Sequence, residues 1–475
     1  MSAKRDARPM WGKVTLLAAA IAALLGLRVG DAIANTYTVT NCLDDGTGGT
    51  LRSQILAVPS PGIDPAPVID MTGLECSTIT LSQSNGQINV EHPVAIYGPT
   101  SHTLDVVGAE CANQYQCENR VFRNNNFNIL VIHDLSIGGG REALDGNAYG
   151  GCIYSKGGVE LHNVRVHDCT ASSATANAAG GAIFAQINAT LDRSTVTASV
   201  AQAPAHAGRG GGIAAQSNIS LAYSTLSFNQ ASGPGGGAFA RRGGLVNAST
   251  ISNNTADTVA GLDIKVFQVY SATSALTIKN STISGNTATT TADGLYTTAG
   301  LFTTAGFVTI SNSTIAFNTV QGTSGAAGVE LSHYSTSDSV TLQSTIISGN
   351  FAGAYERDFA SIAGATATFV TGTNNLVGQS FGYPAVATSS ACPLLGPLRD
   401  NGGLTLTHAL LSGSPAIDTG NNTASSLNYD QRGSAATNGT LDYPRMSGTT
   451  DIGAYEVQKA EVVFDAGFDG CAPPS

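Results

Sequence analysis

Apolar residues recur in register along the middle of the chain, at steps of 25 to 32 residues. One apolar column consists of Ile137, Val166, Val196, Leu226, Ile251, Ile283, Ile315 and Ile347. A second column lies three residues further on and consists of Gly140, Cys169, Ser199, Asn229, Asn254, Asn286, Asn318 and Asn350. Glycine pairs precede an apolar residue at 150–151, 180–181, 211–212 and 236–237. Self-similarity at such a period indicates a repeat architecture.

Within each repeat, apolar and polar residues alternate, as in Val159-Glu160-Leu161. A period of two is typical of β-strands, and the segment Ser-Thr-Ile-Ser-Gly-Asn at 281–286 is a poor helix former. A propeller blade needs about 40 residues or more for its four antiparallel strands. Three short strands in a coil of about 30 residues fit best, so the sequence predicts an all-β parallel β-helix.

In such a solenoid, equivalent residues of successive coils stack about 4.8 Å apart. The isoleucine column is therefore expected to fill the interior, and the glycine pairs to allow sharp corners. The asparagines at 254, 286, 318 and 350 are expected to hydrogen-bond side chain to side chain along the axis. We interpret them as a structural ladder rather than a site.

The first residues resemble a secretory signal. A basic stretch with Lys4, Arg5, Arg8 and Lys13 precedes an apolar run from 14 to 27, and Ala32-Ile33-Ala34 offers a cleavage site. The run is short for a membrane span, although an uncleaved anchor is the alternative. Residues 1–34 are therefore predicted to be a signal peptide cleaved after Ala34, with no membrane span in the chain that remains.

Composition narrows the function classes. Charged residues make up 12% of the chain, hydrophobic residues 42%, and 56 residues are glycine. A disordered chain would combine low hydrophobicity with high charge. The formal charge of −11 excludes a basic nucleic-acid binder, so we expect no nucleic-acid partner.

Eight cysteines follow the signal, an even number that suggests disulfides in an exported chain. Cys111 and Cys117 are close enough to close a small loop, and Cys152 and Cys169 fall on one repeat. A zinc site is disfavoured because no Cys-x-x-Cys pair is present. The full connectivity is left open by the sequence.

Several motifs resemble known families. Gly211-Gly212-Ile213 followed by 224–229 (STLSFN) resembles the repeats of polymorphic outer-membrane proteins and of right-handed β-helix proteins. The opening segments 37–41, 44–46 and 50–55 resemble the start of such proteins. The C-terminal blocks 395–398, 401–403, 413–418, 430–433 and 451–456 resemble the choice-of-anchor Q domain. The resemblance implies a right-handed parallel β-helix with an N-terminal and a C-terminal cap.

The resulting domain division is a signal peptide at 1–34, an N-terminal cap and first coils at 35–110, and β-helix repeats at 111–392. Residues 393–456 would form the choice-of-anchor Q-like cap that closes the second end, and 457–475 a short tail. Leu51 and Ile55 stand at i and i+4, which predicts a short helix over 50–57 closing the first end. Polymorphic outer-membrane proteins carry a C-terminal membrane barrel, for which too few residues remain here.

Candidate chemistry is sparse. A uronate lyase needs carboxylates for Ca²⁺ and a basic residue, and a glycoside hydrolase needs paired carboxylates. The acidic residues, Glu330 among them, are scattered, and the nearest approach to a cluster is Asp263 with Lys265, interpreted as a surface pair across coils. His162 and His167 are expected to point to opposite faces of one strand. His133, His206, His333 and His408 are each isolated.

The densest charge group comprises Asp430, Arg432, Arg445, Asp451 and Glu456. We interpret it as ion pairing inside the cap. No residue is assigned a catalytic, cofactor-binding or metal-binding role, and no cofactor is expected.

The chain beyond residue 34 has no tryptophan. Because sugar-binding grooves often stack sugar rings on aromatic side chains, this weakens the hypothesis of a glycan-degrading enzyme. The sequence therefore favours an exported bacterial surface or extracellular β-helix protein, adhesin-like or structural and without catalytic activity. Its partners would be glycans or proteins of a host, a cell surface or a matrix. The alternative is a polysaccharide lyase or glycoside hydrolase. In-register carboxylates facing a groove would favour the enzyme hypothesis. An unbroken face of Asn and Thr would favour the adhesin hypothesis.

Overall fold

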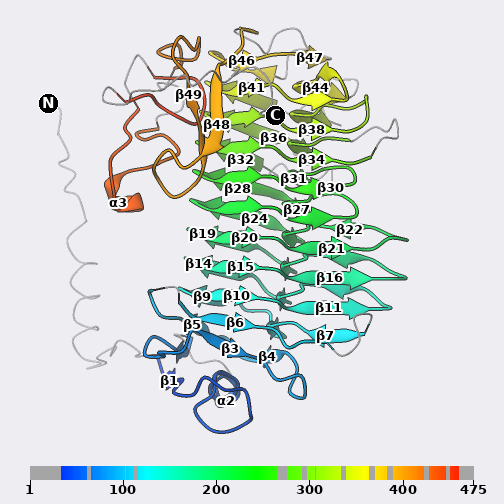
Figure 1. Ribbon diagram of the computed structural model, residues 1–475, viewed down its shortest axis with the longest axis vertical. Helices are drawn as coiled ribbons and strands as arrows, with labels where there is room; N and C mark the ends of the chain where they lie inside the picture. The colour runs from blue at the N-terminus through cyan, green and yellow to red at the C-terminus, as the bar shows by residue number, and fades with distance from the viewer. Residues whose placement is uncertain are drawn as a thin grey trace, which may run out of the picture.

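The chain forms a right-handed parallel β-helix in a computed structural model (Figure 1). The described residues are 34–458 except 61–65, 102, 112–115, 266–274, 291–296, 305, 333–338, 363–369, 382–388, 422–426 and 446–449. The signal segment 1–33 and the tail residues 459–475 therefore lie outside them. Four long sheets, which we name A, B, C and D in the order in which the chain passes through them, run along the rod.

Sheet A has twelve strands in the described residues, all paired in parallel. They are β1 (Thr36–Thr38), β2 (Val68–Asp70), β5 (Ala95–Tyr97), β9 (Leu130–His133), β14 (Val159–His162), β19 (Ala189–Asp192), β24 (Asn218–Ala222), β28 (Gly243–Asn247), β32 (Ala275–Lys279), β36 (Phe307–Ser311), β40 (Ser339–Gln343) and β45 (Val370–Thr371).

Sheet B follows sheet A around a corner and is also parallel. Its strands are β3 (Thr78–Thr80), β6 (Asp105–Val107), β10 (Ser136–Gly138), β15 (Arg165–His167), β20 (Thr195–Thr197), β25 (Thr225–Ser227), β29 (Thr250–Ser252), β33 (Thr282–Ser284), β37 (Thr314–Ala316), β41 (Ile346–Ser348) and β46 (Leu376–Val377).

Sheet C is parallel except for the antiparallel strands at its two edges. Its strands are β7 (Cys117–Asn119), β11 (Arg141–Leu144), β16 (Thr170–Ser173), β21 (Val200–Gln202), β26 (Gln230–Ala231), β30 (Thr255–Ala256), β34 (Thr287–Ala288), β38 (Thr319–Val320), β42 (Phe351–Ala352) and β43 (Tyr355–Glu356). A small parallel sheet, β12 (Ala148–Tyr149), β17 (Ala178–Ala179) and β22 (Gly208–Arg209), lies between sheets C and D in the chain.

Sheet D completes each coil and leads back to sheet A. Its strands are β4 (Ile88–Val90), β8 (Phe122–Asn124), β13 (Ile153–Ser155), β18 (Ile183–Ala185), β23 (Ile213–Ala215), β27 (Ala238–Ala240), β31 (Leu262–Ile264), β35 (Leu301–Thr303), β39 (Val329–Ser332), β44 (Phe359–Ile362) and β47 (Ser380–Phe381).

The interior is built from the predicted columns. The apolar column from Ile137 to Ile347 lies on sheet B in continuous register, and its members are fully buried. The parallel register follows from the repeat, because each coil places the same position one strand spacing above the last. Burying aliphatic side chains on all sides of the interior supplies the main stabilisation of the rod.

The asparagine ladder is confirmed. The amide nitrogen of Asn254 donates to Oδ1 of Asn286 over 2.9 Å, Asn286 donates to Asn318 over 2.8 Å, and Asn318 to Asn350 over 2.8 Å. Each Oδ1 also accepts the backbone N–H of the preceding member. The ladder ends on Asp358, whose Oδ1 accepts from Asn350 over 2.8 Å.

The glycine corners arise from backbone geometry. Gly150, Gly180 and Gly210 have φ values of +66°, +65° and +64°. A Cβ at Gly180 would lie 2.2 Å from the carbonyl oxygen of Ile183. The corner therefore needs glycine both for its left-handed conformation and for its close backbone contact.

The N-terminal helix is confirmed as α2 (Leu51–Leu56), with Thr50 capping it by accepting the backbone N–H of Ser53. Leu51 and Ile55 are buried in the main core, and α2 contacts β1, β2 and β4 of the first coils. This helix thus covers the first end of the rod (Figure 1).

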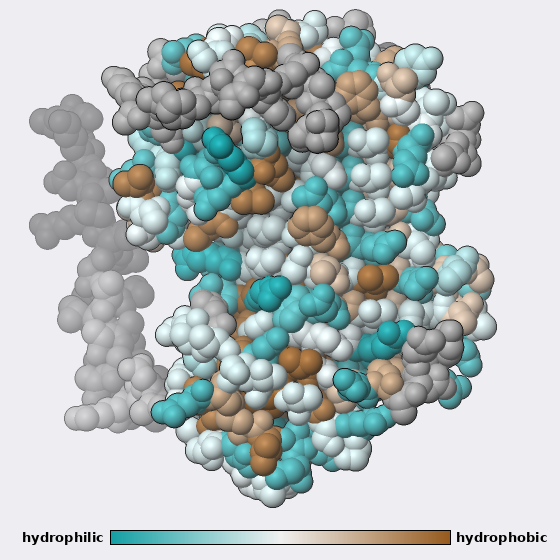
Figure 2. Space-filling model, viewed as in Figure 1, coloured by the Kyte–Doolittle hydropathy of each residue, from teal (hydrophilic) through white to brown (hydrophobic). Residues whose placement is uncertain are grey.

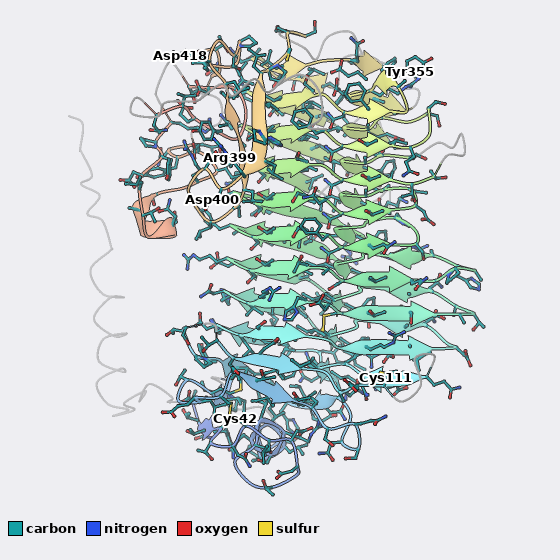
Figure 3. The ribbon with its side chains drawn as sticks, viewed as in Figure 1. Cys42, Cys111, Tyr355, Arg399, Asp400 and Asp418 are labelled. Atoms are coloured by element: carbon teal, nitrogen blue, oxygen red, sulfur yellow. A yellow bond between two sulfur atoms is a disulfide. The ribbon has the colours of Figure 1, made fainter. Side chains whose placement is uncertain are left out.

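Residues 393–456, which we name the flank segment, contain β48 (Leu395–Arg399), β49 (Thr407–Leu410) and α3 (Ala435–Asn438). The sequence predicts a cap over the second end, but the described contacts of this segment run along the outward side of sheet B (Figure 1). Figure 3 shows its residues Arg399, Asp400 and Asp418 on one side of the rod and Tyr355 on the other.

Three disulfides are present in the described part of the chain: Cys42–Cys76, Cys111–Cys117 and Cys152–Cys169. Both local pairings expected from spacing are confirmed. Cys471 lies outside the described residues.

Candidate functional site: an open sheet face and a buried charge column

The outward side of sheet A carries a column of mostly hydroxyl side chains. Its members, in register and exposed or half-buried, are Thr190, Ser220, Leu245, Thr277, Thr309, Thr341 and Thr371. Alternation along each strand sends these residues outward while their neighbours fill the core. From Thr190 to Thr371 the column is uncharged, with Glu160 preceding it in register, and strands of a parallel sheet bring its hydroxyl groups about 4.8 Å apart. It can form repeated hydrogen bonds with an extended polar ligand.

The next outward column of sheet A contains three stacked rings. Tyr97 and His133 have ring centroids 4.3 Å apart, and His133 and His162 lie 4.6 Å apart, with nearly parallel planes. Because the faces cover one another, the ring edges point to solvent. Burial, followed by the neighbouring His162, lowers the pKa of His133. Glu160 contacts Nε2 of His162 at 2.7 Å.

The expectation that His133 is isolated is therefore wrong. The sequence separation of 29 from His133 to His162 equals the local coil length, from Ile137 to Val166, so the stack had a detectable signal in the sequence. His162 and His167 do not share a strand either. They stand on β14 and β15, on two sheets joined by a corner, and both point outward.

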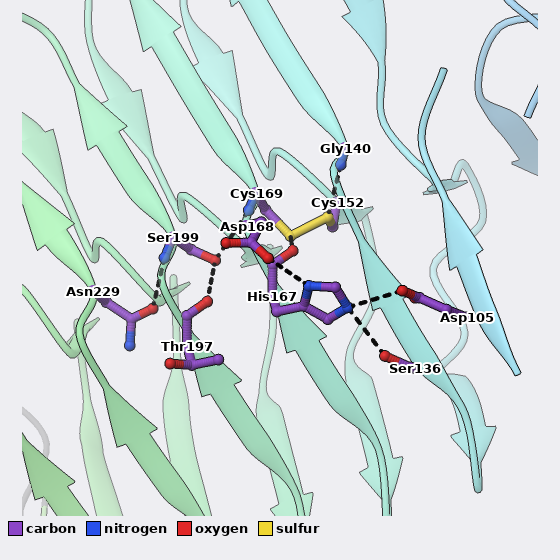
Figure 4. The surroundings of a disulfide bond; sticks show 10 residues. All are labelled: Asp105, Ser136, Gly140, Cys152, His167, Asp168, Cys169, Thr197, Ser199 and Asn229. Carbon is purple, nitrogen blue, oxygen red and sulfur yellow. Dashed lines mark hydrogen bonds and ion pairs between the residues drawn. A yellow bond between two sulfur atoms is a disulfide. The ribbon is translucent and has the colours of Figure 1, made fainter. Parts of the chain in front are cut away.

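His167 holds together three coils of sheet B beside the Cys152–Cys169 disulfide (Figure 4). Its Nε2 lies 3.1 Å from both Asp105 and Ser136, and its Nδ1 lies 2.7 Å from Asp168. Hydrogen bonding to Asp105 raises the pKa of His167. Carboxylates contact both ring nitrogens, so Nε2 is shared between Asp105 and Ser136, which argues against a nucleophilic triad despite the residue types.

Asp263 and Lys265, the pair singled out in the sequence, lie at sheet D rather than on a surface between coils. Asp263 is fully buried on β31, and its Oδ2 is 3.3 Å from Nζ of Lys265, two residues further along the chain. Burial raises the pKa of Asp263 to about 6, against the opposing effect of Lys265. The expectation of an exposed pair across coils is wrong, because Asp263 is buried between Phe239 and Phe302 of the neighbouring coils and Lys265 follows it in the same coil.

The column around Asp263 contains a second carboxylate. Phe239, Asp263, Phe302 and Glu330 follow one another in register on β27, β31, β35 and β39, and all four are buried. Glu330 accepts a hydrogen bond of 2.7 Å from Thr298. From the sequence, these acidic residues were expected to be scattered through turns. The register was missed because the steps between these coils are irregular in sheet D.

The charge group of the flank segment forms ion pairs, as expected. Arg432 donates to Asp430 over 2.8 Å, and its guanidinium lies 3.9 Å from the ring centroids of both Tyr443 and Tyr455. Arg445 pairs with Glu456 at 3.2 Å. All of these charged groups are buried, so the cluster holds the flank segment together.

In the described part of the chain, no group of three or more His, Cys, Asp or Glu side chains is arranged to hold a metal ion. None of the described helices is long and apolar enough to cross a membrane.

No family model and no curated protein matches the chain. Among solved structures, the crystal structure of pectate lyase Pel9A is similar over 90% of this chain and 98% of that one, with 12% sequence identity and a TM-score of 0.39. A likeness at that level carries no argument about activity.

Proposed function

We propose that this chain is an exported, adhesin-like rod that binds an extended polar ligand, such as a glycan chain, along the open face of sheet A. The observation that supports this most directly is the in-register hydroxyl column from Thr190 to Thr371. One hydroxyl contact is weak, but contacts repeated along a rigid rod add up, because each later contact forms within one complex. Leu245 and Phe307, both exposed on this sheet, add apolar contact area.

The rest of the rod supports this choice of face. The flank segment already occupies the outward side of sheet B in the C-terminal coils. On the face drawn in Figure 2, hydrophilic and hydrophobic residues are interspersed, and the outline narrows between the flank segment and the N-terminal coils. Sheet A keeps an exposed, largely neutral column over many coils.

Export and attachment belong to the same proposal. It includes a signal peptide cleaved after Ala34 and a surface or extracellular location. Residues 35–110 are proposed as the N-terminal cap and first coils, and residues 111–392 as the β-helix repeats. The three disulfides fit an oxidising compartment. The resemblance of the repeats to polymorphic outer-membrane proteins, and of 393–456 to the choice-of-anchor Q domain, also stays a proposal, with 457–475 as a tail.

A polysaccharide lyase or hydrolase is the competing hypothesis. Its one supporting observation is that Asp263 and Glu330 stand in one column, two coils apart. Two strand spacings are about 9.6 Å, close to the separation of the two carboxylates in inverting glycosidases, about 6.5–9.5 Å. Both carboxylates are buried, however, whereas a hydrolase must present them to substrate.

The test measures binding and turnover on the same samples. The protein is titrated against neutral glycans and polyuronates, with and without Ca²⁺, and unsaturated products and reducing ends are followed. We expect binding without turnover. The triple variant Thr277→Glu, Thr309→Glu, Thr341→Glu should weaken binding roughly tenfold or more, the effect of about 1.4 kcal/mol.

A matched control exists on sheet C, where Thr255, Thr287 and Thr319 form a half-buried column in register. The same three substitutions there add equal charge to another face. If this control loses binding and the sheet A variant keeps it, the proposed face is wrong. Turnover of any glycan by the unaltered protein would replace the binding-rod proposal with the enzyme.

A further inference from the structure

Asp263 and Lys265 are held against each other in an apolar setting. They stand two residues apart at the end of β31, so their side chains leave the same side of the strand. Phe239 and Phe302 lie in register on the two neighbouring strands and are buried. The ammonium nitrogen of Lys265 is 5.3 Å from the ring centroid of Phe302 and 3.3 Å from Oδ2 of Asp263.

As an ordinary ion pair this arrangement is costly. The carboxylate of Asp263 is fully buried, and apart from Nζ of Lys265, 3.3 Å from Oδ2, its oxygens have no hydrogen-bond partner among the described residues. Buried carboxylates in folded proteins are nearly always hydrogen-bonded. The attraction of one lysine rarely offsets the desolvation of both charges unless additional hydrogen bonds are made. Arg445 and Glu456 show the usual solution in this same chain, because Thr450 and a backbone N–H also donate to Glu456.

We propose that Asp263 and Lys265 become joined by an amide bond between Cγ of the aspartate and Nζ of the lysine. The ammonium group gives up a proton, the free amine attacks Cγ, and one carboxyl oxygen leaves as water. One ammonium and one carboxylate yield one neutral amide and one water, so no oxidant, reductant or activating group is consumed.

The surroundings favour this condensation. Burial raises the pKa of Asp263 to about 6, so the carboxyl group is more readily protonated than usual, and a neutral carboxyl group is the better target for an amine. The contact of 3.3 Å supplies the proximity that makes an intramolecular reaction fast relative to the same reaction in solution. The amide removes the buried negative charge of Asp263 together with the positive charge of the half-buried Lys265.

The test is the mass of the purified, folded chain. We expect it to be lower than the sequence mass by one water molecule, after correction for the disulfides. Trypsin should fail to cut after Lys265, so that residues 243–279 appear as one peptide lacking one water. Fragmentation of that peptide should give no cleavage products between 263 and 265. A full-mass protein that is cut after Lys265 would overturn the proposal.

Two variants separate the amide from other dehydration products. Lys265→Arg keeps the charge and the packing but cannot form the bond, so its mass should include the water. A succinimide at Asp263 would also lack one water, and Lys265→Arg would then still lack it, which would refute the cross-link. Asp263→Asn should give the same cross-linked product by release of ammonia. Lys279→Arg, on the next strand of the chain, β32 of sheet A, should leave the water loss unchanged.

Discussion

A buried polar side chain is tolerable when each of its groups has a partner, and the coil repeat supplies those partners automatically. Asn286 accepts from the backbone and side chain of Asn254 and donates to Asn318 and to the carbonyl oxygen of Ile251. The same residue type at each step of 32 residues therefore satisfies both of its neighbours. One asparagine lost from this series leaves groups on two other coils unsatisfied.

Substitution of Asn286 by alanine tests this dependence. The change removes the acceptor of two buried N–H groups of Asn254, each of which costs about 1–3 kcal/mol when left unpaired. We expect the free energy of unfolding to fall by roughly 2–5 kcal/mol in denaturant titrations. Asn188→Ala is the control, because Asn188 is exposed and its side chain accepts the backbone N–H of Asn218. Equal, small losses in both variants would contradict the structural role of the ladder.

At the scale of elements, the flank segment is held to sheet B by hydroxyl residues of successive coils. Gln431 joins two coils, since its Nε2 donates to Thr250 and its Oε1 accepts from Thr282. Thr314, on the next coil, accepts the backbone N–H of Ala454. His408 of β49 completes the contact through Ser284, with 2.8 Å between its Nε2 and the hydroxyl oxygen.

This contact should be sensitive to acid. Burial lowers the pKa of His408 to about 4, so the neutral ring is the form present in the fold. The pKa of histidine in the unfolded chain is near 6.5. The free energy of unfolding that depends on the neutral His408 ring is therefore fully present above pH 6.5 and is lost as the pH falls toward 4. At pH 4.5 this loss amounts to roughly 2–3 kcal/mol at most, at about 1.4 kcal/mol per pH unit.

Denaturant titrations at pH 7 and pH 4.5 measure this loss. The variant His408→Gln keeps hydrogen-bonding groups but cannot be protonated, so its stability should change less between the two pH values than that of the unaltered protein. An identical change in both proteins would show that His408 does not control the contact.

The sequence predicts those parts of the fold that repeat. The interior isoleucines and the asparagine ladder follow from periodicity, because stacking relates each residue to the one about 30 positions away. The site of the flank segment does not follow, since Thr250 contacts Leu406, 156 residues away and outside any period. The sequence did not predict that Asp263 is buried, for a related reason. The strand pattern indicates that its side chain points outward, but not that residues far away in the sequence bury it.

At the scale of the whole molecule, the flank segment and the rod form one unit. Ala316, Phe317 and Ile346 of the rod are buried together with Leu395, Leu410 and Tyr455 of the flank segment in a second apolar cluster. Removing residues 393–475 would uncover this apolar side of sheet B, together with the hydroxyl groups of Thr250 and Thr282. A large apolar patch exposed to water favours association.

A chain that ends at residue 392 should therefore melt at a lower temperature and self-associate. Thermal unfolding and light scattering measure both effects at matched concentrations. As a control, a chain lacking only 459–475 retains every described contact of the flank segment. If the shorter chain remains monomeric with an unchanged melting temperature, the flank segment is not part of the stable unit.

The contacts between the flank segment and sheet B also limit how such a protein can change its length during evolution. The four coils that carry Ile251, Ile283, Ile315 and Ile347 are spaced by identical steps of 32 residues, whereas the earlier steps vary from 25 to 30. Duplicating one repeat among the early coils would lengthen the rod and leave the flank segment in place. The same duplication between Ile251 and Ile347 would carry a hydroxyl partner out of reach. We therefore expect duplications of single repeats to be tolerated in the N-terminal coils, and the number of coils that contact the flank segment to stay constant.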